Sequence, residues 1–339
     1  GSVTPSEEDV MSLTYRNEQG KEIIQNYEDY TKAVEEMNAL DASYTDVKLT
    51  LLKDISVTVG SGEDWTHIID INRTCTLDLA GYTYSVRSNS YQVVAVYVYG
   101  DLTFTLMDSS SSGTGMIYGV GNSTMPVRIG NSAEGGAYAD TEECDVHFIM
   151  KSGILKARTL TGQASYALAQ PSFAETTIEG GTIYGGISSY GKLTVQDGLI
   201  ECASPLSVVF VMRGAEFIMT GGTIRNTDTE SASLDDNEGQ AVGIICADTE
   251  VVISGGVLES VNGPALRLEG HMNGGVNDAS ETTINGNAKL ISQNDAAIRF
   301  SFNRASNDTQ LENKHVLTID GNAVLKGASS ILDIYKNKT

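Results

Sequence analysis

Positive charge, long apolar runs and cysteine are all scarce in this chain, and each scarcity excludes a class of function. The 339 residues contain 44 Asp and Glu but only 22 Lys and Arg. A surface with that balance repels nucleic-acid phosphate and anionic lipid, so we expect no nucleic-acid partner. No run of residues is apolar enough to span a bilayer, so we expect no direct membrane insertion. The acidic composition suits a secreted or cell-surface protein.

The four cysteines are far apart in the sequence and show no Cys-x-x-Cys spacing. Cys202 and Cys246 lie in apolar stretches, where a free cysteine behaves as a small hydrophobic residue. We therefore expect buried free thiols instead of a disulfide framework or a metal site. The chain opens with Gly1-Ser2, a pair typical of cloning, so we expect a native leader or anchor to have been removed.

What the chain does contain is a repeat. An apolar strand, a second strand that ends in a Gly-rich corner and a third short strand recur, most clearly as AVGIICAD, TEVVISGG and VLES over residues 241–260. A unit that cannot bury its own apolar face must stack on its neighbours. Three short strands per unit, joined by turns, predict an all-β solenoid: a right-handed parallel β-helix of about ten coils.

The organisation along the chain follows from this repeat. Residues 1–25 are polar, and we expect them to be partly disordered. Residues 26–45 carry apolar side chains at helical spacing, which predicts a short helix that caps the first coil. Residues 46–339 form the β-helix domain. We expect Gly181, Gly222 and Gly256 at equivalent left-handed corners, with Asn287 and Asn322 replacing glycine in later coils.

Several motifs carry a resemblance to a known family. They are LTLLKDI (Leu49–Ile55), LDLAGYTYS (Leu77–Ser85), LTFTLMDSSSSGTGMIYG (Leu102–Gly119) and TIEGGTIYGG (Thr177–Gly186). With them the chain resembles, from about Tyr27 onward, the adhesin-like right-handed β-helix proteins found on the surfaces of host-associated bacteria, which have a pectin-lyase-like fold. Family members commonly have Asn where Ala80 stands. The motifs are structural, so the resemblance implies a fold and a location but no active site.

Strand parity suggests a binding face. In VVAVYVYG, inward valines alternate with Tyr97 and Tyr99, and in equivalent strands Arg128, Arg267 and Arg299 fall between inward apolar residues. Tyrosines offer flat contact area and arginines grip carboxylates or sulfates. We therefore expect these five residues to bind an extended, partly anionic glycan. The alternative is that outward positions are polar only for solubility. Long connections at Asn131–Asp145, Gly270–Glu281 and Asn303–His315 are expected to cluster at one corner, as binding loops or as neutral insertions.

One insertion is rich in carboxylates and could hold a calcium ion, the sole cofactor that the sequence suggests. Its candidate ligands are Asp228, Glu230, Asp235, Asp236 and Glu238. The spacing matches no known calcium loop, so a solvated acidic loop is the alternative. The segment also has the Asn-Thr-Asp and Asp-Asp elements of polygalacturonase-type hydrolases, but in that family these elements lie about one coil apart, and here they share one loop.

Two main functions remain. The first is a non-catalytic, adhesin-like module that binds a glycan or a host surface protein, most simply as a monomer. The second is a polysaccharide lyase or glycoside hydrolase acting on acidic polysaccharide, which fold analogy alone supports. A purely structural stalk is a third.

Overall fold

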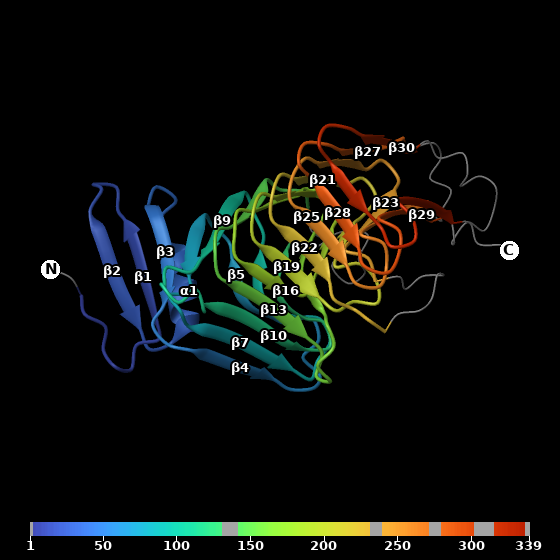
Figure 1. Ribbon diagram of the computed structural model, residues 1–339. Helices are drawn as coiled ribbons and strands as arrows, with labels where there is room; N and C mark the ends of the chain where they lie inside the picture. The colour runs from blue at the N-terminus through green and yellow to red at the C-terminus, as the bar shows by residue number, and fades with distance from the viewer. Residues whose placement is uncertain (1–2, 131–141, 231–238, 271–278, 302–314, 336–339) are drawn as a thin grey trace. The chain divides into compact units, whose positions relative to one another are not determined.

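The computed structural model describes residues 3–130, 142–230, 239–270, 279–301 and 315–335 (Figure 1). The chain divides into two compact units, residues 1–168 and 169–339. In both units short strands follow one another so that each coil adds one strand to each of three sheets, named here the first, second and third sheet. Within each unit, neighbouring strands of successive coils pair in parallel.

Unit 1 begins with an antiparallel start and continues with parallel coils. Its first sheet contains, in spatial order, β2 (Glu22–Tyr27), β1 (Met11–Arg16), β3 (Thr45–Leu51), β6 (Cys75–Asp78), β9 (Leu102–Met107) and β12 (Val146–Met150). Its second sheet contains β4 (Ile55–Val59), β7 (Thr83–Ser88), β10 (Met116–Gly121) and β13 (Ile154–Arg158), which lie side by side in Figure 1. Its third sheet contains β5 (His67–Ile71), β8 (Val93–Val98) and β11 (Thr124–Ile129). The division between the units falls within β14 (Tyr166–Gln170).

Unit 2 repeats the three-strand coil. Its first sheet contains β15 (Ala174–Ile178), β18 (Lys192–Val195), β21 (Glu216–Met219), β24 (Glu250–Ile253), β27 (Ser280–Ile284) and β30 (His315–Ile319). Its second sheet contains β16 (Thr182–Tyr184), β19 (Leu199–Cys202), β22 (Thr223–Asn226), β25 (Val257–Ser260), β28 (Lys289–Ser292) and β31 (Val324–Lys326). Its third sheet contains β17 (Gly186–Ser189), β20 (Val209–Val211), β23 (Val242–Cys246), β26 (Leu266–Gly270), β29 (Ile298–Ser301) and β32 (Leu332–Tyr335). The predicted all-β parallel β-helix is confirmed.

Columns of identical or similar inward side chains make the core. In the second sheet of unit 2, one column on successive strands is completely buried and consists of Ile183, Ile200, Ile224, Leu258 and Leu290. Burying each such side chain stabilises the fold by about 1.5–3 kcal/mol. In unit 1, Phe104 and Phe148 stack in the same way, with ring centroids 5.6 Å apart.

The start of the chain differs from the sequence-based expectation. Residues 1–25, expected to be partly disordered, contain β1 and most of β2, which pair antiparallel. The hairpin forms because Met11, Leu13 and Tyr15 alternate as an apolar face and are buried. The helix α1 (Tyr30–Ala39) lies inside the predicted range 26–45, and Asp29 caps it by accepting the backbone N–H of Thr31. Its buried face is Ala33, Val34 and Met37.

The predicted glycine corners are confirmed and the predicted asparagine corners are wrong. Gly181, Gly222 and Gly256 have φ angles of +86°, +82° and +81°. In the later coils the left-handed residues are Gly286 and Gly321, not Asn287 and Asn322. The reason is turn length: residues 285–288 connect β27 to β28, whereas residues 254–256 connect β24 to β25, so the left-handed position moves back by one residue.

All four cysteines are free thiols. Burial raises the pKa of the Cys75 and Cys202 thiols to about 12, so both are protonated at neutral pH. In the part of the chain that the structure describes, no helix is both long and apolar enough to cross a membrane.

Candidate functional site

A face of threonines covers the first sheet of unit 1. Thr74-Cys75-Thr76 and Thr103-Phe104-Thr105 lie on neighbouring coils, and Thr76 is in register with Thr105. Because the side chains of Cys75 and Phe104 are buried in the core, strand alternation points the flanking threonines outward. The Thr74 hydroxyl accepts the backbone N–H of Thr103 at 3.2 Å, which fixes one hydroxyl of the set.

A groove of about 650 Å³ lies over this face. A smaller hollow of about 270 Å³ shares Asp46, Val47 and Thr76 with it, so the two hollows adjoin. The groove has five hydroxyls, two amides, three charged groups and one phenol along its wall. These are Thr45, Thr74, Thr76, Thr103 and Thr105, Asn38 and Asn72, Asp46, Arg73 and Asp101, and Tyr44.

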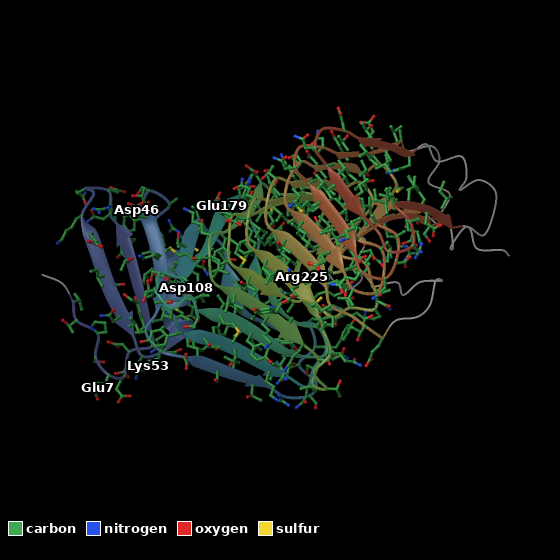
Figure 2. All side chains as sticks on the ribbon, in the orientation of Figure 1. Glu7, Asp46, Lys53, Asp108, Glu179 and Arg225 are labelled. Carbon is green, nitrogen blue, oxygen red and sulfur yellow. The ribbon has the colours of Figure 1, made fainter. Side chains whose placement is uncertain are left out.

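Asp46 is the residue that shapes the hollow. Thr14 pairs with Lys48 and Arg16 with Thr45, so Tyr15 faces two residues of β3, a β-bulge that includes Asp46. Asp46 has a φ of +52°, a conformation that favours glycine, and its carboxylate lies 3.2 Å from the Arg16 guanidinium. Bulges and left-handed residues re-aim side chains and are frequent at binding sites. Asp46 lies at the start of β3 (Figure 2).

The rim of the groove is held by hydrogen bonds that involve the end of α1 and the segment that follows it. Arg73 donates to the carbonyl oxygens of Leu40 at 2.8 Å and Tyr44 at 3.2 Å. Asn38 donates to the carbonyl of Asp70 and accepts the N–H of Asn72, at 2.9 and 3.1 Å. The guanidinium and the amide therefore position the wall before any ligand arrives.

Most polar groups along the wall are neutral. The Cys75 thiol behind the threonines is protonated at neutral pH, because burial raises its pKa far more than Arg73 lowers it. The Tyr44 ring is held against Tyr15 with centroids 5.3 Å apart and planes 8° from parallel. The Asp101 carboxylate accepts the backbone N–H of Asp145 at 2.8 Å. Hydroxyls and amides both donate and accept hydrogen bonds, so the wall suits a ligand that does the same.

The tyrosines predicted to bind ligand are placed differently from the expectation. Tyr97 is buried, 8% exposed, and its ring stacks on His67 with centroids 3.8 Å apart. The Tyr99 hydroxyl donates to the carbonyl of Glu142 at 2.8 Å. Arg128 is in register with Tyr97 on the next strand, as parity predicts. The three residues therefore do share one region of unit 1, but Tyr97 offers little open surface.

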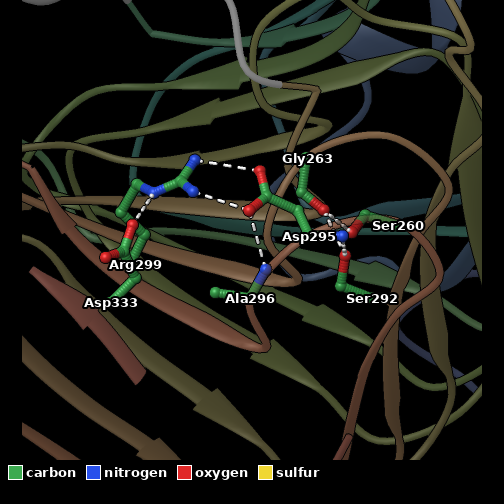
Figure 3. A network of polar contacts seen from close by, with 7 residues as sticks. All are labelled: Ser260, Gly263, Ser292, Asp295, Ala296, Arg299 and Asp333. Atoms are coloured by element: carbon green, nitrogen blue, oxygen red, sulfur yellow. Dashed lines mark hydrogen bonds and ion pairs between the residues drawn. The ribbon is translucent and has the colours of Figure 1, made fainter. Parts of the chain in front are cut away.

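The predicted arginines of unit 2 are buried. Arg267 and Arg299 are in register on neighbouring strands, yet only 3% and 4% of their surfaces are exposed. Arg299 donates to both oxygens of Asp295, at 2.6 and 2.9 Å, and to Asp333 at 2.9 Å (Figure 3). Arg267 donates to the hydroxyl of Ser301 at 3.1 Å. The expectation that these arginines are open to solvent is wrong, because carboxylates and hydroxyls of the same unit engage them.

The calcium prediction falls mostly outside the described residues. Asp235, Asp236 and Glu238 lie in the range 231–238, which the structure does not describe. Asp228 and Glu230 are described, and the backbone N–H of Asp228 donates to the side chain of Asn226 at 3.0 Å. Among the described residues no three or more His, Cys, Asp or Glu side chains gather as a metal site. The three long connections predicted as binding loops also lie largely outside the described ranges.

A row of glutamates was not anticipated from the sequence. Glu216, Glu250 and Glu281 are in register on successive strands of the first sheet of unit 2, with Lys192 next to Glu216. Neighbouring strands lie about 4.8 Å apart, so these carboxylates repel one another. The signal was present in the sequence, because each glutamate precedes a buried strand residue, Phe217, Val251 or Thr282, at the same coil position.

Comparisons with protein-family models, with curated proteins and with solved structures give no match to this chain. The groove of unit 1 is therefore the feature from which a function can be inferred.

Proposed function

We propose that this chain is a non-catalytic β-helix module, secreted or displayed at a bacterial cell surface, that binds a hydroxyl-rich glycan in the groove of unit 1. One observation carries the proposal: the outward threonines of β6 and β9 and the bulged Asp46 line the same hollow. The resemblance to adhesin-like surface proteins supports the location, and a glycan fits a role in attachment.

The groove complements a glycan in size and in chemistry. Its volume of about 650 Å³ is in the usual range for ligand sites. Sugar hydroxyls donate and accept hydrogen bonds, as do the hydroxyls of Thr76 and Thr103 and the amides of Asn38 and Asn72. The wall is held in place by hydrogen bonds, which lowers the entropic cost of binding.

The charge of the chain favours a neutral glycan over an anionic one. The formal net charge is −22, and two carboxylates, Asp46 and Asp101, line the groove against one guanidinium that is engaged with carbonyls. The buried arginines of unit 2 offer no open cationic surface. We therefore replace the partly anionic ligand expected from the sequence with a neutral one.

The test is retention on immobilised glycans, neutral (xyloglucan, mannan, mucin-type) and anionic (polygalacturonate, heparin), followed by calorimetry on the glycan retained best. Replacing Thr76 and Thr103 together with valine removes two hydroxyls with little change of shape. We expect the double variant to bind at least about tenfold more weakly, about 1.4 kcal/mol. Thr194→Val makes the same change at a first-sheet position of unit 2 and should leave binding unchanged.

The same panel separates the competing functions. Equal binding by the Thr76/Thr103 variant and the parent chain would contradict the groove as the site. New reducing ends or unsaturated uronides would replace the non-catalytic proposal with a lyase or hydrolase, and the glutamate row would be the next place to look. If no glycan in the panel retains the chain, a purely structural stalk would be the remaining function.

A further inference from the structure

The only tryptophan of the chain stands on an exposed corner in an unfavourable backbone conformation. Trp65 lies just before β5, is 37% exposed and has a φ of +66°. A positive φ is a genuine outlier for so bulky a residue, because its Cβ crowds the backbone. A tryptophan that served packing alone would be buried and unstrained. Strain that persists on a surface points to a role in binding.

A second exposed ring lies against it. Tyr91, on the same corner of the next coil, is 41% exposed, and the two rings meet edge to face at 90° with centroids 5.3 Å apart. The Trp65 backbone N–H donates to the Tyr91 carbonyl at 3.0 Å, and the Tyr91 N–H donates to the Asp64 carboxylate at 2.7 Å. These bonds tie the two corners together.

A buried serine makes the corner rigid. Ser90 is 2% exposed; its hydroxyl accepts the N–H of Glu63 at 2.8 Å and donates to the carbonyl of Gly60 at 2.6 Å. Gln92, on the other side of Tyr91, is also left-handed, with a φ of +57°. The backbone on both sides of the rings is therefore fixed, and the two aromatic faces are organised in advance of any ligand.

We propose that Trp65 and Tyr91, the aromatic platform, form a second carbohydrate subsite that stacks on the apolar C–H face of a pyranose ring. Trp and Tyr rings give large, rigid contact area with a polar edge, which matches a sugar ring with one apolar face and a rim of hydroxyls. The inference rests on the proposed glycan-binding function and extends it from the groove to a second contact.

Strand β5 connects the two subsites. It begins beside Trp65 and ends at Ile71, directly before Asn72 and Arg73 on the groove wall. Its five residues span roughly 17 Å at about 3.3 Å per residue. The ligand class is therefore an oligosaccharide long enough to reach both contacts, and monosaccharides should bind far more weakly because they engage only one.

Because Trp65 is the only tryptophan of the chain, its fluorescence reports directly on binding at the platform. Cellohexaose, xylohexaose and mannohexaose would be titrated into the full chain while Trp65 emission is recorded. We expect a saturable change in emission with at least one of them, and at least tenfold weaker binding of that sugar by Tyr91→Ala. The matched control is Tyr82→Ala, an equally exposed tyrosine at another corner of unit 1. No saturable change with any of the three sugars would overturn the platform.

A glycine variant separates binding from structure. Because glycine accepts a φ of +66° without strain and keeps the N–H to Tyr91, Trp65→Gly should unfold at the same or a higher Tm while losing at least tenfold in oligosaccharide affinity by calorimetry. A lower Tm with unchanged affinity would show a structural residue and overturn the inference. If the Thr76/Thr103 variant loses binding and Trp65→Gly does not, the platform fails and the groove stands. If neither variant changes binding, the proposed function itself fails.

Discussion

Unit 1 and unit 2 repeat the same coil but treat buried charge in opposite ways. Unit 1 buries carboxylates that pair with no cation among the described residues: Asp78 and Asp108 are 3% and 8% exposed and accept backbone N–H groups at a corner. Unit 2 buries guanidiniums, Arg267 and Arg299, and pairs Arg299 with carboxylates. The inward columns are alike, so the fold depends on them, whereas corner and outward positions are free to differ.

The outward face of the first sheet shows the same contrast. In unit 1 it carries threonines over a groove, and in unit 2 it carries the row Glu216, Glu250 and Glu281. Hydroxyls form a surface that can bind neutral ligands, while a row of like charges costs stability. In this β-helix, the candidate binding site therefore lies where outward side chains depart from the pattern of the repeat.

Removing the carboxylate that pairs with Arg299 should have the largest effect on the free energy of unfolding. The Arg299 side chain is only 5% exposed, and Asp295→Asn removes the carboxylate that engages its guanidinium through both oxygens, so we expect a loss of about 3 kcal/mol in the free energy of unfolding. Asp333 is 41% exposed, so Asp333→Asn should cost about 1 kcal/mol or less. Urea denaturation of both variants is the measurement, and equal losses would contradict a buried pair.

Replacing Asp108, a buried corner carboxylate of unit 1, should have the next largest effect on stability. Burial alone would raise the pKa of Asp108, but hydrogen bonds from Ser110, Gly115 and Gly81 outweigh it and lower the pKa. Asp108→Asn replaces one acceptor oxygen with a donor and should cost about 2 kcal/mol. Because the folded pKa is the lower one, the contribution is complete above the unfolded value of about 3.9 and is lost as pH falls through the folded value.

Asp54→Asn is the control for that variant, because Asp54 is exposed and accepts the backbone N–H of Thr83. It should cost no more than about 1 kcal/mol. A similar loss for both variants, or an unfolding curve for Asp108→Asn with the same acid dependence as the parent chain, would count against the corner network.

A histidine should make the stability of unit 2 depend on pH in a range above that of Asp108. Burial lowers the pKa of His315 to about 4, so it is neutral in the folded chain at neutral pH. Its contribution to stability is complete above the unfolded pKa of about 6.5 and is lost as pH falls towards about 4. His315→Phe should therefore lose less stability than the parent chain between those values. Parallel Tm-against-pH curves for the two proteins would disprove it.

Relieving a strained corner should stabilise unit 1 modestly. Ala80 has a φ of +48° and its neighbour Gly81 a φ of +84°, in a turn closed by the bond from the Tyr82 N–H to the Leu79 carbonyl. Asn tolerates this conformation better than Ala, so Ala80→Asn should gain about 0.5–1 kcal/mol. Ala328, which has no positive φ, gives the control Ala328→Asn. A loss of stability in Ala80→Asn would show that strain is not the controlling term.

The smallest effect should come from the glutamate row. Glu250→Gln removes the middle charge, and we expect a gain of about 0.5 kcal/mol at low salt that fades as salt is added. The denaturant guanidinium chloride would itself screen these charges, so thermal unfolding at two NaCl concentrations is the suitable assay. A gain that does not change with salt would mean that repulsion is not its cause.

The repeat made the coils predictable, because inward Val, Ile and Leu recur at fixed spacing and glycines such as Gly222 and Gly256 mark the corners. The first hairpin was missed because it is not part of the repeat, although the alternation of Met11, Leu13 and Tyr15 indicates a strand. Parity correctly paired Arg267 with Arg299. It could not show that Asp295, four residues earlier, and Asp333, on the next coil, engage Arg299.

The groove was not predictable for a different reason. Its outward threonines follow from alternation, but the hollow depends on the bulge at Asp46 and on the hydrogen bonds from Arg73 to Leu40 and Tyr44, which join segments distant in sequence. The same holds for Trp65, whose left-handed backbone has no pattern in the sequence.

The most direct test of the account is hydrogen–deuterium exchange of the full chain, with and without the neutral glycan that the panel retains best. Glycan binding in the groove predicts slower exchange confined to unit 1 and largest at residues 38–47, 72–76 and 101–105 around the groove. Protection confined to β21, β24 and β27 of unit 2, or no protection anywhere at saturating glycan, would contradict it.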